Sequence, residues 1–156
     1  MGRKIKHYLK EFILLVIFIT IVTNIISLYK SRELIQKPLS INYQLPHANA
    51  PVLVHFWATW CPICKLEASN IQRLSKYYNV ITIAVKSDKT EIKKYMKENN
   101  LDFNVINDKD GKLSQKFNIA VYPTTFIYDK DKKLIFSDVG YTSTFGMWVR
   151  LLWAEL

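Results

Sequence analysis

The sequence predicts an α/β domain with a mixed central sheet flanked by helices, preceded by one N-terminal transmembrane helix. Short apolar runs that are typical of buried strands alternate with segments in which apolar residues recur every three or four positions, as on one face of a helix. Two further strand-like runs are separated by a short polar turn. This arrangement indicates a hairpin and therefore antiparallel strands in the same sheet. An uncharged stretch near the N-terminus predicts the transmembrane helix.

The first third of the chain is predicted to hold a membrane anchor and a tether. Residues 1–11 form a basic end, and residues 12–29 carry no charged side chain over a length that is just enough to span a bilayer. Residues 30–49 are mostly polar, contain two prolines and are interpreted as a tether. The folded domain is then expected over residues 50–156.

The uncharged stretch has an alternative interpretation as a cleaved signal peptide. Such a peptide usually has a shorter apolar region, followed by a cleavage site of small residues. No convincing site lies near Ser27–Lys30, so we favour an uncleaved anchor. Four basic residues precede the stretch, which favours an N-terminus in the cytoplasm. The chain is then expected to be a single-pass protein of the inner membrane with its folded domain in the periplasm.

The net charge of +9 does not by itself indicate a nucleic-acid-binding protein. Residues 1–37 hold seven of the 22 Lys and Arg residues but two of the 13 Asp and Glu residues, so over half of the excess lies beside the predicted anchor. The rest of the chain has an ordinary mixed surface, and we predict no nucleic-acid partner.

The first strand and helix of the domain surround a pair of cysteines. Val52–Trp57 is a nearly continuous apolar run, as expected for a central strand covered on both faces, although His55 interrupts it. A helix from Cys61 to about Tyr78 follows, because apolar residues recur along it at three- and four-residue spacings. Val80–Val85 is predicted to be the next buried strand.

A helix, a strand and a short helix are expected next. Asp88 or Thr90 can cap the first of these helices, whose apolar residues share one face. Phe103–Ile106 is predicted to be a short strand, and the turn Asp108–Gly111 leads into a short helix over Leu113–Phe117.

A hairpin and a last helix complete the predicted domain. Thr124–Tyr128 and Leu134–Phe136 flank the polar turn Asp129–Lys132, which is typical of a hairpin. Thr142 or Ser143 can cap the last helix. The side chains of this helix that are expected to face the core are Phe145, Trp148, Val149 and Leu152.

Both cysteines of the chain lie at the start of the first helix, three residues apart. Unpaired backbone N–H groups and the helix dipole favour a thiolate on the first sulfur. We therefore predict that Cys61 is the attacking thiol and that Cys64, one turn further in, is the resolving thiol of a redox-active disulfide. Pro62 suits the first turn because it has no N–H to leave unpaired. A zinc site usually needs four ligands, and no second Cys or His pair is present, so no metal is predicted.

Three features of the sequence resemble the thioredoxin superfamily. They are the segment from Trp57 to Cys64 (WATWCPIC), Glu67 three residues after the second cysteine, and the segment Val121–Asp129, in which Tyr122-Pro123 precedes a strand. Within the superfamily the chain is similar to the membrane-anchored TlpA-like and ScsD-like thiol–disulfide oxidoreductases. The resemblance covers about residues 50–156 and implies a thioredoxin-like fold.

The resemblance also implies roles for residues around the cysteines. The Tyr122–Pro123 bond is expected to be cis, to lie against the cysteine pair and to offer its backbone to a substrate peptide; the alternative is a trans proline that starts a strand. Trp60 is expected to cover one side of the disulfide. Glu67 is expected to lie near the thiols and to exchange a proton with the resolving thiol, whereas from sequence alone it is a solvated helix carboxylate.

His55 departs from the family pattern. Many thioredoxins carry an acid at this position, which accepts a proton beneath the active site. An imidazole can do the same near neutral pH, and the alternative interpretation is a core histidine whose hydrogen bonds are satisfied.

These observations predict a membrane-anchored oxidoreductase that reduces disulfides of protein substrates by dithiol–disulfide exchange, without a bound cofactor. In an oxidising compartment it needs electrons from the cytoplasm, and the resemblance implies a transmembrane carrier of the DsbD type. Three alternatives use the same residues differently: an oxidase or isomerase with the same cysteines, a copper-binding module with thiolate ligands, and a redox-inert interaction domain.

Overall fold

The computed structural model describes residues 7–8, 10–15, 18, 22, 45–47 and 49–156, and it divides the chain into two compact units, residues 1–33 and 34–156. The described residues of the first unit are helical. None of the described helices has the length and the hydropathy that a bilayer crossing requires. Most of the predicted anchor (residues 12–29) and tether (residues 30–49) lies outside the described residues, so both stay predictions.

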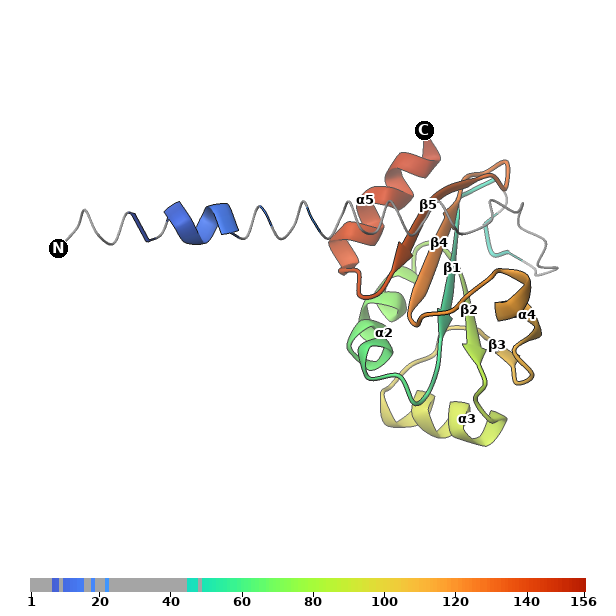
Figure 1. The fold of residues 1–156 in the computed structure, drawn as a ribbon. Helices are drawn as coiled ribbons and strands as arrows, with labels where there is room; N and C mark the ends of the chain where they lie inside the picture. The colour runs from blue at the N-terminus through green and yellow to red at the C-terminus, as the bar shows by residue number, and fades with distance from the viewer. Residues whose placement is uncertain (1–6, 9, 16–17, 19–21, 23–44, 48) are drawn as a thin grey trace. The chain divides into compact units, whose positions relative to one another are not determined.

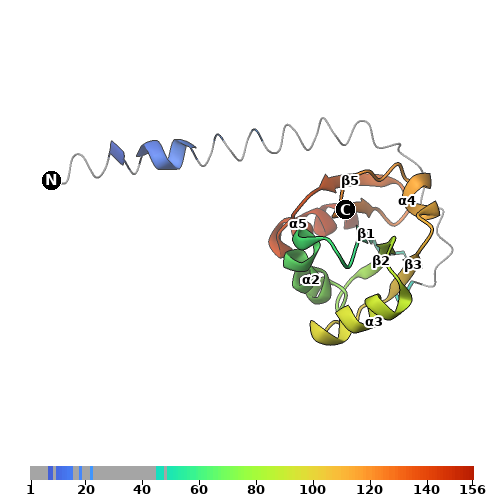
Figure 2. The ribbon, with the colours of Figure 1, turned by 60° about the horizontal axis from the view of Figure 1, so that its bottom comes forward.

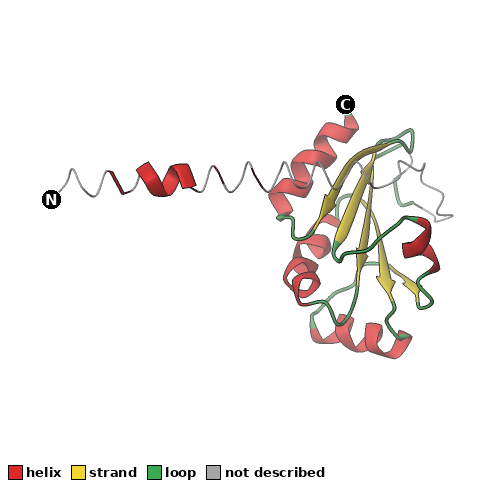
Figure 3. Ribbon diagram, viewed as in Figure 1, coloured by secondary structure: helices red, strands yellow, loops and turns green. Residues whose placement is uncertain are grey.

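Strands and helices alternate along the second unit before a hairpin and a final helix (Figures 1 and 3). In chain order the elements are β1 (Val52–Trp57), α2 (Pro62–Leu74), β2 (Asn79–Val85), α3 (Lys89–Glu98), β3 (Val105–Asp108), α4 (Lys112–Lys116), β4 (Thr124–Tyr128), β5 (Leu134–Val139) and α5 (Thr144–Glu155).

The strands form one mixed sheet in the order β3-β2-β1-β4-β5. β1 pairs with β2, and β2 with β3, in parallel, because a helix connects the two strands of each pair. β4 is antiparallel to β1 and to β5, as the predicted hairpin requires. The predicted α/β fold with a mixed central sheet flanked by helices is therefore confirmed for this unit.

Each face of the sheet carries its own apolar core, because side chains alternate between the faces along every strand. α2, α3 and α5 cover one face, over a cluster that includes Leu53 and Trp57 of β1. α4 and the chain around it cover the other, over a cluster that includes Val54 and Phe56. Figure 2 shows α4 on the opposite side of the sheet from the other helices.

Three strands differ from their predicted boundaries: β2 begins one residue earlier, at Asn79, β3 is shifted towards the C-terminus, and β5 is longer. β3 begins at Val105, because Phe103 leaves the strand and packs its ring edge-on against Trp57, with ring centroids 6.1 Å apart. β5 continues to Val139, three residues beyond the predicted end at Phe136, and pairs with β4 along this extension.

The prediction for the inner face of α5 was wrong. Its buried residues are Met147, Leu151 and Ala154. The four residues expected to face the core are all exposed, and the side chain of Phe145 is 69% exposed. The helix is apolar on most of its circumference, so spacing alone does not identify the face that meets the sheet. Ser143 does cap this helix, since its hydroxyl accepts the Gly146 N–H.

The two faces of α5 give a direct test of this packing. We expect Met147→Ala to lower the free energy of unfolding by about 2–5 kcal/mol, because it leaves a cavity at a fully buried site. Phe145→Ala should cost less than about 1 kcal/mol, since the ring already lies largely in water. Urea unfolding of both variants measures the difference; a larger loss for Phe145→Ala contradicts this orientation of the helix.

Candidate active site

The two cysteines form a disulfide at the point where β1 ends and α2 begins. Cys61 has extended backbone angles and is the N-cap of α2, so its side chain lies over the free N–H groups of the first turn. The Cys64 N–H donates to Cys61 Sγ at 3.2 Å. Pro62 occupies the first turn, where a backbone N–H has no partner within the helix, so its lack of an N–H costs no hydrogen bond. The turn is therefore built to stabilise negative charge on Cys61 Sγ.

The Tyr122–Pro123 bond is cis, and it lies against the disulfide as the resemblance implied. Cys61 Sγ is 3.6 Å from the carbonyl oxygen of Tyr122. The turn is held from both sides, because the Thr124 hydroxyl donates to the Val121 carbonyl at 2.7 Å and the Gly140 N–H donates to the Pro123 carbonyl at 2.8 Å. Two segments that are some 60 residues apart in the sequence thus meet at the sulfur atoms.

Exposed apolar side chains surround the buried disulfide. Trp60 is 58% exposed, and its ring packs edge-on against Tyr122 with ring centroids 5.8 Å apart. Ile63 of α2 and Val121 of the cis-proline turn are also exposed. Trp57 belongs to the core instead, where it packs on Tyr95 and Phe103. This surface can bind the apolar residues of an extended peptide while the sulfur atoms react.

Glu67 is not a solvated carboxylate, which corrects the interpretation from sequence alone. It lies one turn beyond Cys64 on the buried face of α2 and is 0% exposed. Its Oε1 accepts the Thr142 N–H at 2.9 Å, and its Oε2 has no hydrogen-bond partner among the described residues. Burial raises the pKa of Glu67 to about 8; the Thr142 N–H lowers it in part, and the negative charge of Asp138 raises it further.

His55 lies buried under α2, on the same face of β1 as Leu53 and Trp57. Its Nδ1 is 2.9 Å from the Thr125 hydroxyl on β4. Burial lowers the pKa of His55 to about 3, so the ring is neutral over the physiological range and is a weak base. These surroundings favour the core-histidine interpretation over the proton acceptor.

The residues that attach α2 to the chain between β5 and α5 were not predicted from the sequence. The Asn70 amide donates to the Tyr141 hydroxyl and to the Thr142 carbonyl, each at 3.2 Å, and its oxygen accepts the Thr144 hydroxyl at 2.8 Å. Asn70 interrupts the apolar face of the helix beside Ile71, and that interruption was the available signal. Among the described residues, no three His, Cys, Asp or Glu side chains gather as a metal site would require.

The buried carboxyl group of Glu67 predicts how stability depends on pH. Because the pKa of Glu67 is about 8 in the folded protein and 4.5 in the unfolded chain, the folded state binds more protons between these pH values. This group therefore destabilises the fold increasingly as the pH rises from about 4.5 to about 8.

We expect Glu67→Gln to remove this effect while its amide oxygen still accepts the Thr142 N–H. The variant should be about 1–3 kcal/mol more stable than the unsubstituted protein at pH 9 and similar to it at pH 4. Chemical unfolding across this pH range checks the result, and a stability difference that does not change with pH would exclude the titration described here.

Comparison with known proteins agrees with the fold. Residues 35–137 match the AhpC/TSA family. A thioredoxin-like protein of Haemophilus influenzae is 34% identical over 109 residues, which cover 69% of this chain and 65% of that protein. The thiol-disulfide oxidoreductase ResA of Bacillus cereus is 35% identical over 94 residues, which cover 57% of this chain and 54% of ResA.

The matches thus span less than two thirds of the length of these two relatives. A solved structure of a putative thiol:disulfide interchange protein DsbE from Chlorobium tepidum has the same fold, with a TM-score of 0.66 over 78% of this chain and 98% of that chain at 20% identity. The match over residues 35–137, together with this shared fold, shows that the chain belongs to the AhpC/TSA family of thioredoxin-like proteins.

Proposed function

We propose that this chain is a thiol–disulfide oxidoreductase that reduces disulfides of protein substrates. The observation that carries the proposal is the placement of Cys61 Sγ between the first N–H groups of α2 and the cis-proline turn. A sulfur at this position is stabilised as a thiolate, and it lies beside a backbone carbonyl that can pair with an extended substrate strand. The relatives named as thiol-disulfide oxidoreductases support the same chemistry.

The proposed reaction starts from the reduced pair. The Cys61 thiolate attacks one sulfur of a substrate disulfide, forming a mixed disulfide and releasing the other substrate sulfur as a thiolate. The Cys64 thiol then loses its proton and attacks Cys61 Sγ. This step forms the Cys61–Cys64 disulfide and releases the second substrate thiolate, so two electrons pass from the chain to the substrate.

The surroundings of the disulfide supply the binding and the proton transfer that these steps need. The Tyr122 carbonyl, beside Cys61 Sγ, offers a hydrogen-bond acceptor to the backbone of an extended peptide. Glu67, on the same buried face of α2 as Cys64, is placed to take the proton of the resolving thiol. With a pKa of about 8, close to that of a free thiol, Glu67 can accept and return this proton with little free-energy difference.

We further propose that residues 12–29 anchor the chain in the inner membrane and that the domain works in the periplasm. The uncharged stretch and the basic residues before it support this arrangement. Disulfides persist in such a compartment, so a reductase there must be recharged with electrons from the cytoplasm. A transmembrane carrier of the DsbD type, which exchanges with the Cys61–Cys64 pair, is the proposed partner.

The order of attack can be tested by trapping. We expect Cys64→Ser to form a stable mixed disulfide with an oxidised protein substrate such as insulin, because no resolving thiol releases Cys61. The matched control, Cys61→Ser, should form this adduct at least about tenfold more slowly, because the remaining thiol lacks the N-cap position. Mass spectrometry of the full chain after mixing measures both rates; equal rates for the two variants contradict the assignment.

A further inference from the structure

A row of polar side chains crosses the apolar face of the sheet beneath α2 and α5. Thr82, His55, Thr125 and Asp138 are partners in register on β2, β1, β4 and β5, and all four are buried. Partners in register point to the same face of a sheet, so the row lies under the helix that carries the cysteines. Asp138 ends the row on the edge strand β5.

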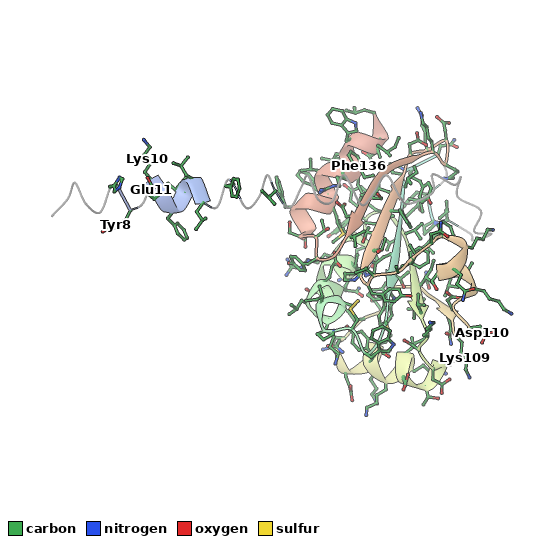
Figure 4. The ribbon with its side chains drawn as sticks, viewed as in Figure 1. Tyr8, Lys10, Glu11, Lys109, Asp110 and Phe136 are labelled. Carbon is green, nitrogen blue, oxygen red and sulfur yellow. A yellow bond between two sulfur atoms is a disulfide. The ribbon has the colours of Figure 1, made fainter. Side chains whose placement is uncertain are left out.

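Asp138 is fixed by a cation from α5. Arg150 Nε lies 3.1 Å from Asp138 Oδ2, an ion pair without a well-aligned hydrogen bond. The same guanidinium donates to the Gly146 carbonyl at 3.0 Å and lies 6.0 Å from the centroid of the Phe136 ring. Phe136 is labelled in Figure 4. These contacts fix the position of Arg150. Burial raises the pKa of Asp138, and the Arg150 guanidinium opposes this rise and favours the ionised carboxylate.

The chain that follows Asp138 runs directly to Glu67. Four residues after Asp138, the Thr142 N–H donates to Glu67 Oε1, and Asn70 holds the same segment through three hydrogen bonds. Two ionisable groups lie closest to Glu67 along these connections: Cys64, one turn before it on the buried face of α2, and Asp138 on β5, whose negative charge acts on it. Around them are Arg150, which pairs with Asp138, Tyr141, whose hydroxyl accepts from Asn70, and His55, which belongs to the same row of strand partners as Asp138.

The charges of this cluster are balanced when one of its two carboxyl groups is protonated. His55 is neutral, so the cluster contains two buried carboxyl groups and one guanidinium. Two ionised carboxylates would leave one buried negative charge without a partner, which is strongly unfavourable. Neither Asp138 Oδ2 nor Glu67 Oε2 has a hydrogen-bond partner among the described residues, but Asp138 Oδ2 lies 3.1 Å from the Arg150 cation. The proton therefore belongs on Glu67, which has no such cation beside it in the described structure.

We propose that Asp138, held by Arg150, is a positioning residue that keeps Glu67 protonated while the Cys61–Cys64 pair is oxidised. The catalytic use of this proton rests on the function proposed above. When a donor thiolate attacks Cys61 Sγ, the Cys61–Cys64 bond breaks and Cys64 leaves as a thiolate. It takes the proton from Glu67, which becomes a carboxylate, and Glu67 takes a proton back when Cys64 later attacks the mixed disulfide.

The test is a titration of Glu67 in the oxidised full chain. Glutamate labelled with ¹³C at the side-chain carboxyl reports the ionisation by NMR, and the Glu67→Gln variant identifies the signal. We expect a midpoint near 8 in the unsubstituted protein. Asp138→Asn should lower it by about one pH unit or more, because the neighbouring negative charge is removed.

The matched control is Asp131→Asn, which makes the same change of charge at an exposed position of the β4–β5 turn. We expect it to leave the Glu67 midpoint within about 0.2 pH units, since exposed charges are screened. A midpoint that does not move in Asp138→Asn overturns the proposal.

A second measurement covers the case in which Asp138→Asn does not fold. In the unsubstituted protein with ¹³C-labelled aspartate, Asp138 should remain ionised throughout the range in which Glu67 titrates. Protonation of Asp138 at a pH at or above the Glu67 midpoint overturns the proposal. Neither titration requires a substrate or turnover. Their outcome is therefore independent of the trapping experiment that tests the function.

Discussion

The site depends on one hydrogen bond, from the Cys64 N–H to Cys61 Sγ at the N-terminus of α2. It exists because β1 delivers the chain to the helix with extended backbone angles at Cys61, which places the side chain over the first turn. The Cys64 N–H moves with the helix, but a shift of α2 along the sheet would separate Cys61 Sγ from the Tyr122 carbonyl. The buried apolar face of α2, from Ala68 to Leu74, therefore fixes the chemistry as well as the fold.

The apolar packing of α2 also buries the ionisable groups near the disulfide. Burial favours the protonated form of Glu67 and the neutral form of His55, so both side chains lie in the core without a charge. Asp138 is the exception, and it is compensated by Arg150. The hydrogen bonds of Glu67 and Asn70 thus attach α2 to the chain after β5. The bond from the Thr142 N–H also affects the pKa of Glu67.

The sequence was sufficient for the features that depend on local chemistry. A Cys-x-x-Cys pair after a buried strand identifies the N-terminus of a helix, and the resemblance around Pro123 correctly implied the cis bond. It was not sufficient where the outcome depends on tertiary packing. α5 is apolar nearly all round, so its inner face is chosen by the fit of Met147 and Leu151 to the sheet.

The burial of Glu67 could not be predicted for the same reason. Whether a helix carboxylate lies in water or in the core depends on what covers it, and the covering segment around Thr142 is 75 residues away in the sequence. Asp138 was missed because β5 was predicted to end at Phe136, two residues before it. Charged residues are rarely buried without a partner, so a charged residue on the inner face of a strand indicates a special role. It can be recognised only when the strand boundary is known.

The reduction potential of the Cys61–Cys64 pair in the full chain, measured by equilibration in glutathione and dithiothreitol buffers, tests the central claim most directly. Among the described residues, the hydrogen-bond donor to Cys61 Sγ is a single backbone N–H, so the thiolate is stabilised only moderately. This predicts a value near that of thioredoxin, about −270 mV. A value near that of the oxidant DsbA, about −120 mV, would contradict the account and make the chain a donor of disulfides.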